Sequence, residues 1–70
     1  MMQQHNKRTE PMFDVIEVDI VTRKILMMGQ GQDERNAEAI ERMALMRRGN
    51  GDNFFTTVPA GLYAEGDTYQ

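Results

Sequence analysis

The feature that most limits the fold is a single stretch, residues 34–48, with the periodicity of a long helix. Its apolar residues recur at spacings of three and four, which places them on one side of a helix. They are Ala37, Ala39, Ile40, Met43, Ala44 and Met46. One helix cannot enclose a core by itself, so the flanking segments must form a sheet against it.

Residues 12–21 alternate between apolar and other side chains, as a half-buried strand does. Ile16, Val18 and Ile20 fall on one face of this strand, and Val15 falls on the other face among acids. We expect the richer face to receive the helix. Val15 is then predicted to point away from the helix.

Residues 25–30 are predicted to return from the first strand in a hairpin, and the aromatic and β-branched residues 54–58 form a third strand. The predicted fold class is α+β with the order ββαβ. It has a three-stranded antiparallel sheet in the order 2-1-3 and one helix packed on one face. The predicted domain covers residues 12–62, between a disordered arm at 1–11 and a partly ordered tail at 63–70.

Local signals mark both ends of the helix. Asp33 has the side chain of a helix N-cap, and Gly49 supplies a residue that ends a helix easily. Arg47 and Arg48 in the last turn interact favourably with the negative end of the helix dipole.

The predicted topology gives these two arginines neighbours. The helix runs back along the second strand, so its end returns to the hairpin bend that carries Arg23 and Lys24. One basic patch would then contain Arg23, Lys24, Arg47 and Arg48. Such a patch suits a phosphate-bearing ligand or an acidic protein surface. A purely structural origin also stays open, because basic residues are common at helix C-termini and in turns.

Two apolar residues are candidate contacts for a partner. Leu45 falls on the polar side of the helix. Val15, with one of the two phenylalanines, lies on the face of the sheet that the helix leaves open. A homodimer or a captured partner would bury that face, and the alternative is that Leu62 and Tyr63 fold back over it.

The composition argues against catalysis and metal binding. The 70-residue chain has no cysteine or serine, and its one histidine, His5, lies in a polar stretch. Glu17 and Asp19 are two apart on one strand face, a spacing that a solvated surface also has. We therefore expect no enzyme activity, no metal and no cofactor. No apolar run approaches the roughly 20 residues of a membrane helix, so we expect no membrane contact and a cytoplasmic location.

The acid-bearing first strand, the run "ERNAEAI..MA.MRRG" and the short "FF" strand together resemble small, mostly uncharacterised proteins of tailed bacteriophages. The order of elements is also similar to small phage inhibitors of host RNA polymerase. That resemblance implies a module that plugs into a groove of a large enzyme through charged residues on its strands. This chain differs because "FFTTVPA" has no arginine, which argues against polymerase inhibition.

The leading hypothesis is a non-enzymatic, phage-type interaction protein of the host bacterial cytoplasm. It would bind and inhibit a host protein, a host protein complex or a defence component, using the four cations with Leu45 or the open sheet face. The alternative is an oligomeric sponge for a nucleotide or another phosphate-bearing signal. A third hypothesis is an assembly protein of the virion.

Overall fold

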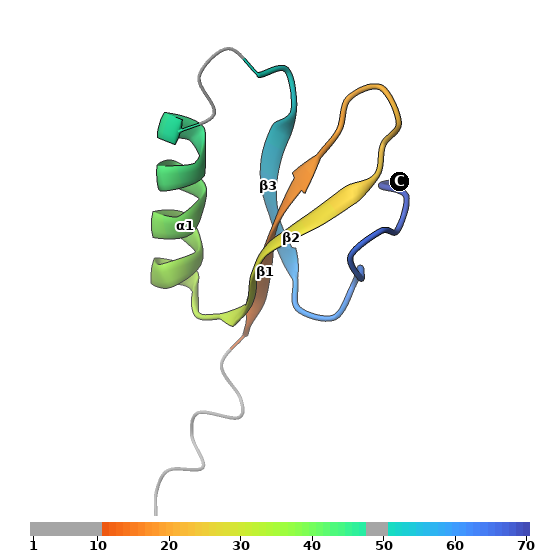
Figure 1. Ribbon diagram of the computed structural model, residues 1–70. Coiled ribbons are helices and arrows are strands. Elements are labelled where there is room, and N and C mark those ends of the chain that lie inside the picture. The colour runs from red at the N-terminus through yellow and green to blue at the C-terminus, as the bar shows by residue number, and fades with distance from the viewer. Residues whose placement is uncertain (1–10, 48–50) are drawn as a thin grey trace, which may run out of the picture.

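The computed structural model describes residues 11–47 and 51–70 of the chain. Within them the elements follow the order β1, β2, α1, β3 (Figure 1). Their bounds are β1 Phe13–Val18, β2 Ile25–Gln32, α1 Glu34–Arg47 and β3 Phe54–Pro59. β1 is the central strand of a sheet in the order β2-β1-β3, and both pairings are antiparallel. The predicted α+β class, element order and strand order are confirmed.

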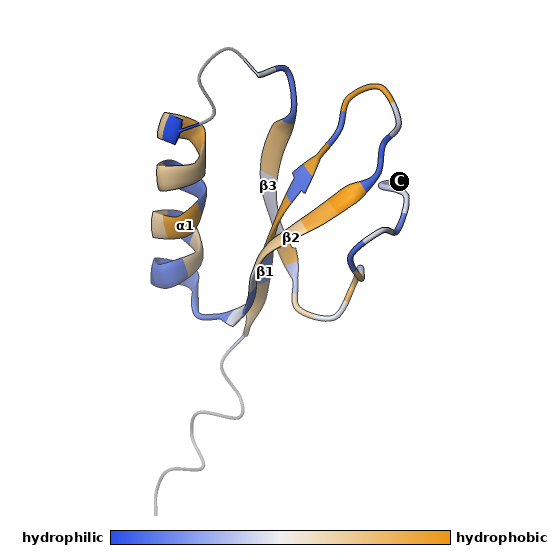
Figure 2. Cartoon of the chain, viewed as in Figure 1, coloured by the Kyte–Doolittle hydropathy of each residue, from blue (hydrophilic) through white to orange (hydrophobic). Residues whose placement is uncertain are grey.

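β1 ends before the predicted end of the first strand. The carboxyl group of Asp19 accepts hydrogen bonds from the N–H groups of Val21 and Thr22, at 2.8 and 3.0 Å, and so closes a turn directly after the strand. Ile20 and Val21 consequently lie in the bend instead of in the sheet. Figure 2 shows this bend as a strongly hydrophobic tip that projects from the molecule.

β2 extends beyond the predicted residues 25–30, and the buried acid Asp14 bonds its end and joins it to another part of the fold. Only 3% of the surface of Asp14 is exposed. One carboxyl oxygen accepts from the N–H of Gly31 at 2.8 Å, and the other accepts from the N–H of Gly61 at 3.0 Å. Both glycines have positive φ angles, 61° and 84°, a conformation that other residues adopt only with strain. Asp14 thereby fixes the end of β2 and the turn after β3 to the central strand.

The start of α1 is capped as the sequence predicts. The side chain of Asp33 accepts from the N–H of Asn36 at 2.8 Å, and its carbonyl accepts from the N–H of Ala37 at 2.9 Å. Arg47 is the last residue of α1. The predicted cap at Gly49 lies outside the described residues.

The helix covers the opposite face of the sheet from the one predicted. Val15 is fully buried, and its cross-strand neighbour Thr57 donates its hydroxyl hydrogen to Glu41 of α1 at 2.7 Å. The prediction that Val15 lies on an open face is therefore wrong. The physical reason is size: α1 buries the small residues Ala37 and Ala44, which let the helix approach this less bulky face closely.

The other face is covered by the C-terminal segment. Ile16, Val18, Ile25 and Val58 form a buried cluster on this face. Rings from residues 63–70 pack on it: the centroids of Tyr63 and Tyr69 are 5.5 Å apart, and Tyr69 meets Phe54 edge to face at 5.4 Å. Of the two alternatives for this second face, the structure supports the chain folding back, although through these tyrosines and not through the exposed Leu62.

Backbone hydrogen bonds hold this C-terminal segment against the start of β2. The N–H of Ile25 donates to the carbonyl of Asp67 at 2.9 Å, and the N–H of Gly66 donates to the carbonyl of Ile25 at 2.8 Å. Lys24 and Thr68 form a β-bridge beside them. The start of the β2 edge of the sheet is thus covered by the chain itself.

Replacing Asp14 tests its role as the joint of the fold. We expect Asp14→Ala to lower the free energy of unfolding by about 2 kcal/mol, because two N–H groups lose their acceptor. Asp14→Asn keeps one accepting oxygen and should lose about half as much. Urea unfolding followed by circular dichroism measures both. Equal midpoints for the wild type and Asp14→Ala would contradict this role.

Candidate functional site

Two adjoining hollows form the candidate site, on the side of the sheet that carries α1. They measure about 280 and 240 Å³, and both are lined by Glu17 and Asn53. The side-chain amide of Asn53 donates to the Glu17 carboxylate at 2.8 Å, so this pair is fixed where the hollows meet. Arg47 lines one hollow and Lys24 lines the other. We call this surface the Glu17–Asn53 groove.

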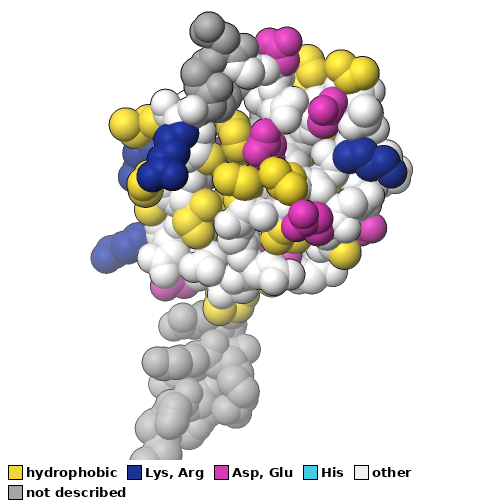
Figure 3. All heavy atoms as spheres, in the orientation of Figure 1, with side chains coloured by type: hydrophobic (Ala, Val, Ile, Leu, Met, Phe, Trp, Pro, Cys, Tyr) yellow, Lys and Arg dark blue, Asp and Glu magenta, His cyan; other side chains and the backbone are white. Residues whose placement is uncertain are grey.

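Apolar side chains accompany these charges. Phe55 lines the hollow that contains Arg47, and Leu26 lines the hollow that contains Lys24. Leu26 is 48% exposed, although it lies inside a strand. Seen from the side shown in Figure 3, hydrophobic side chains gather over α1 and β2, with acids among them and basic residues on both flanks. The groove therefore offers an apolar surface between separated cations.

The β1–β2 bend holds Lys24 in place. Besides its two side-chain bonds, Asp19 exchanges backbone bonds across the bend: its N–H donates to Lys24 at 3.1 Å, and its carbonyl accepts from Arg23 at 2.7 Å. Thr22 adds a hydroxyl acceptor for the N–H of Lys24 at 3.2 Å. The backbone N–H groups of Thr22 and Val21 hold the pKa of the Asp19 carboxyl below its ordinary value of 3.8.

Arg23 lies on the other side of the sheet. Its backbone has a positive φ of 68°, which is unusual for a residue with a side chain. Its guanidinium lies 5.4 Å from the centroid of the Tyr69 ring, within the range of a cation–π contact. Since Tyr69 packs on the buried cluster opposite α1, Arg23 faces away from the groove.

The structure divides the four predicted cations. Figure 1 shows the end of α1 and the β1–β2 bend at the same end of the molecule, as the predicted return path requires. Lys24 and Arg47 lie on one surface with Glu17 between them, while Arg23 stacks on Tyr69 on the opposite face. Arg48 lies outside the described residues. The prediction of a single basic patch is therefore wrong for Arg23.

The two predicted apolar contacts differ in their accessibility. Leu45 is 46% exposed on α1, so a partner can reach it. Val15 has no exposed surface and cannot serve as a contact. Its burial under α1 follows from the choice of sheet face described above.

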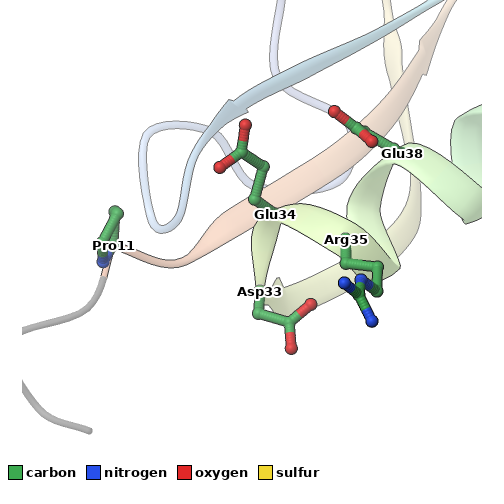
Figure 4. A pocket seen from close by; sticks show the side chains of 5 residues that line it. All are labelled: Pro11, Asp33, Glu34, Arg35 and Glu38. Atoms are coloured by element: carbon green, nitrogen blue, oxygen red, sulfur yellow. The ribbon is translucent and has the colours of Figure 1, made fainter. Parts of the chain in front are cut away.

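An acidic hollow lies at the start of α1. It measures about 480 Å³ and is lined by Pro11, Asp33, Glu34, Arg35 and Glu38. Figure 4 shows Glu34 and Glu38 extending from the same side of α1 toward β3. Among residues 11–47 and 51–70, no group of three or more His, Cys, Asp or Glu side chains is arranged to hold a metal ion.

Within the same residues, no helix combines the length and the apolar character needed to cross a bilayer. Comparison with protein-family models, with curated proteins and with solved structures found no match to this chain.

Sequence reasoning did not identify the centre of the groove. Glu17 and Asn53 are 36 residues apart, and only the pairing of β1 with β3 brings them together. The predicted partly ordered tail, residues 63–70, contains Tyr69, whose ring is part of the packing around the core. The available signal was the pair of tyrosines in a short C-terminal segment, because aromatic residues tend to be at least partly buried.

The turn made by Asp19 has a pH dependence that can be measured. A folded-state pKa below the ordinary value means that the carboxylate stabilises the fold above about pH 4, and that this contribution is lost as the pH falls through the folded pKa. We expect Asp19→Ala to be less stable than the wild type at pH 7 and to approach it at low pH. Urea unfolding midpoints between pH 7 and pH 2.5 test this. A gap that stays constant over this range would contradict it.

Proposed function

We propose that the protein is a non-enzymatic interaction module that binds a host protein through the Glu17–Asn53 groove and inhibits it. The single observation that carries the proposal is the composition of this surface. A fixed carboxylate–amide pair lies between Lys24 and Arg47, and the half-exposed Leu26 lies beside it. Protein interfaces commonly combine an apolar anchor with charged groups at its rim.

The arrangement of charge favours a protein surface over a phosphate-bearing ligand. A phosphate site needs several cations that converge on one point. Here the Glu17 carboxylate lies between Lys24 and Arg47, and it would repel a phosphate placed between them. Arg23 is engaged with Tyr69 on the other face. Among the described residues, the charges therefore favour a protein partner over the nucleotide-sponge alternative.

The proposed host setting comes from the resemblance of the first strand and the helix to small proteins of tailed bacteriophages. Proteins of that kind act on host machinery or on defence components. A groove with both signs of charge suits a partner with a complementary mixed surface, and such complementarity contributes mainly to specificity and to the rate of association. The cytoplasm of the infected bacterium is the proposed place of action.

Substitution of the groove tests the proposal. The tagged protein is produced in bacteria, and partner recovery by mass spectrometry and inhibition of growth are both measured. We expect Leu26→Asp, and separately the pair Lys24→Ala and Arg47→Ala, to reduce partner recovery about tenfold and to relieve growth inhibition. A thermal-shift panel of nucleotides should leave the melting temperature unchanged.

Matched substitutions elsewhere serve as controls. Leu62 is 57% exposed and lies outside the groove, so Leu62→Asp should keep both activities. The pair Arg35→Ala and Arg42→Ala removes two exposed cations of α1 that do not line the groove. It changes the net charge by the same amount as the pair Lys24→Ala and Arg47→Ala. Groove variants that fold and still recover the partner at the wild-type level would refute the assignment, and a nucleotide that raises the melting temperature would support the rival function.

A further inference from the structure

The outer edge of β3 is open, and its free backbone groups can be identified. Hydrogen-bonded pairs alternate along antiparallel strands. Since the N–H of Ala60 donates to the carbonyl of Met12 at 3.0 Å, the next bonded pair is Asp14 with Val58, and the alternation continues along the strand. The backbone groups of Phe55 and Thr57 therefore point away from β1. Within the part of the chain that the structure describes, no strand pairs with them.

The two edges of the sheet are protected differently. On the β2 side, Ile25 is hydrogen-bonded to Gly66 and Asp67 of the C-terminal segment, and the β1–β2 register contains irregularities. The β1–β3 register is regular, and residues 54–58 include neither a charge nor a proline, the usual devices that block an edge. Pro59 limits the open edge at one end, because it has no N–H and its carbonyl accepts from Leu62.

A row of acids runs alongside this edge. The hydrogen bond from Thr57 to Glu41 places that side of α1 next to β3. Glu34, Glu38 and Leu45 share the side with Glu41, because residues three, four and seven positions apart lie on one face of a helix. Figure 4 shows the first two extending toward β3, where the acidic hollow opens. A strand added to the sheet would lie about 4.8 Å beyond β3, close to these carboxylates.

We propose that the edge of β3 binds an extended segment of a partner protein as a fourth strand, and that this segment carries basic residues on the side facing α1. The N–H and C=O groups of Phe55 and Thr57 would bond the incoming backbone. Alternate residues of a strand lie about 6.7 Å apart. This spacing matches the rise of about 6 Å between Glu34 and Glu38 along the helix, so two successive basic residues can each meet one acid.

The same acids argue against a second copy of this chain as the occupant. Pairing of β3 with its symmetry mate would bring both copies of α1 to the same face of one continuous sheet. Glu34, Glu38 and Glu41 of each chain would then face their equivalents, and like charges that meet across a sheet are destabilising. A basic segment converts this repulsion into attraction.

A peptide binding experiment on the full chain tests the proposal. The probe is a fluorescent, end-capped peptide of alternating lysine and valine, and its alternating glutamate and valine counterpart is the control. We expect the lysine peptide to raise the fluorescence anisotropy and to slow hydrogen exchange at the amides of Phe55 and Thr57. The glutamate peptide should do neither. Binding of the lysine peptide should weaken with added salt, because the carboxylates of Glu34 and Glu38 are exposed to solvent.

Two sets of variants separate the backbone contribution from the charges. Thr57→Pro removes an outward N–H and the hydroxyl group that bonds Glu41, but no backbone bond of the native sheet. Thr57→Val replaces the hydroxyl by a methyl group and keeps the N–H, so it is the matched control. We expect the proline variant to weaken lysine-peptide binding about tenfold and the valine variant to keep it. The pair Glu34→Gln and Glu38→Gln should weaken binding about fivefold. The pair Glu65→Gln and Asp67→Asn makes the same change in net charge in the C-terminal segment beside β2 and should have no effect.

Several outcomes would overturn the proposal. One is peptide binding without slower exchange at Phe55 and Thr57, and another is equal binding by the proline and valine variants when circular dichroism shows both folded. A third outcome is that these amides are already protected from hydrogen exchange in the free chain and lose this protection when residues 2–10 are removed. The occupant would then be the chain's own N-terminal segment. Protection that grows with protein concentration alone would identify a second copy. The groove variants leave this edge intact, so the two proposals fail independently.

Discussion

The fold depends on one buried carboxyl group. Asp14 lies in the central strand, and its two oxygens accept from the backbone of Gly31, at the end of β2, and of Gly61, in the turn after β3. A buried polar group is costly unless it is hydrogen-bonded, so each of these two segments must keep its N–H in position. Both segments use a glycine with positive φ, which places those N–H groups with little strain. The side chain therefore fixes the end of β2 and the exit of β3 together.

The sheet satisfies its two faces by different means. On one face, Ala37 and Ala44 allow α1 to lie close to Val15, and a side chain at Gly29 would come within 2.8 Å of Ile40. On the other face the aliphatic cluster is covered by tyrosine rings, which fill space without requiring a second helix. With α1 and the C-terminal segment, the described part of the chain thereby builds a two-sided core. Exposed apolar side chains remain on α1, on β2 and in the bend, among them Met46, Leu26 and Val21.

The sequence was informative wherever a signal was local. The alternation of β1, the cap at Asp33 and the three-residue spacing from Ala37 to Ile40 predicted the elements and their order, and the return path of α1 was correct. It was less informative where competing packings had to be compared. The face with Ile16 and Val18 has the larger side chains, and hydrophobicity alone assigned the helix to it. The observed choice depends on fit, because small helix residues suit the face of Val15, which is bordered by Gly29.

The two bonds of Asp14 also differ in the length of chain that they close. One spans 17 residues and the other spans 47. By loop-closure entropy, the longer span costs about 0.9 kcal/mol more to bring together. The hairpin of β1 and β2 is thus favoured to form early, and the closure by β3 and the turn at Gly61 to come late. Interactions that form after the transition state act mainly on the rate of unfolding. The second oxygen of a single side chain would then govern how long the native state persists, whereas the first contributes to how quickly it is reached.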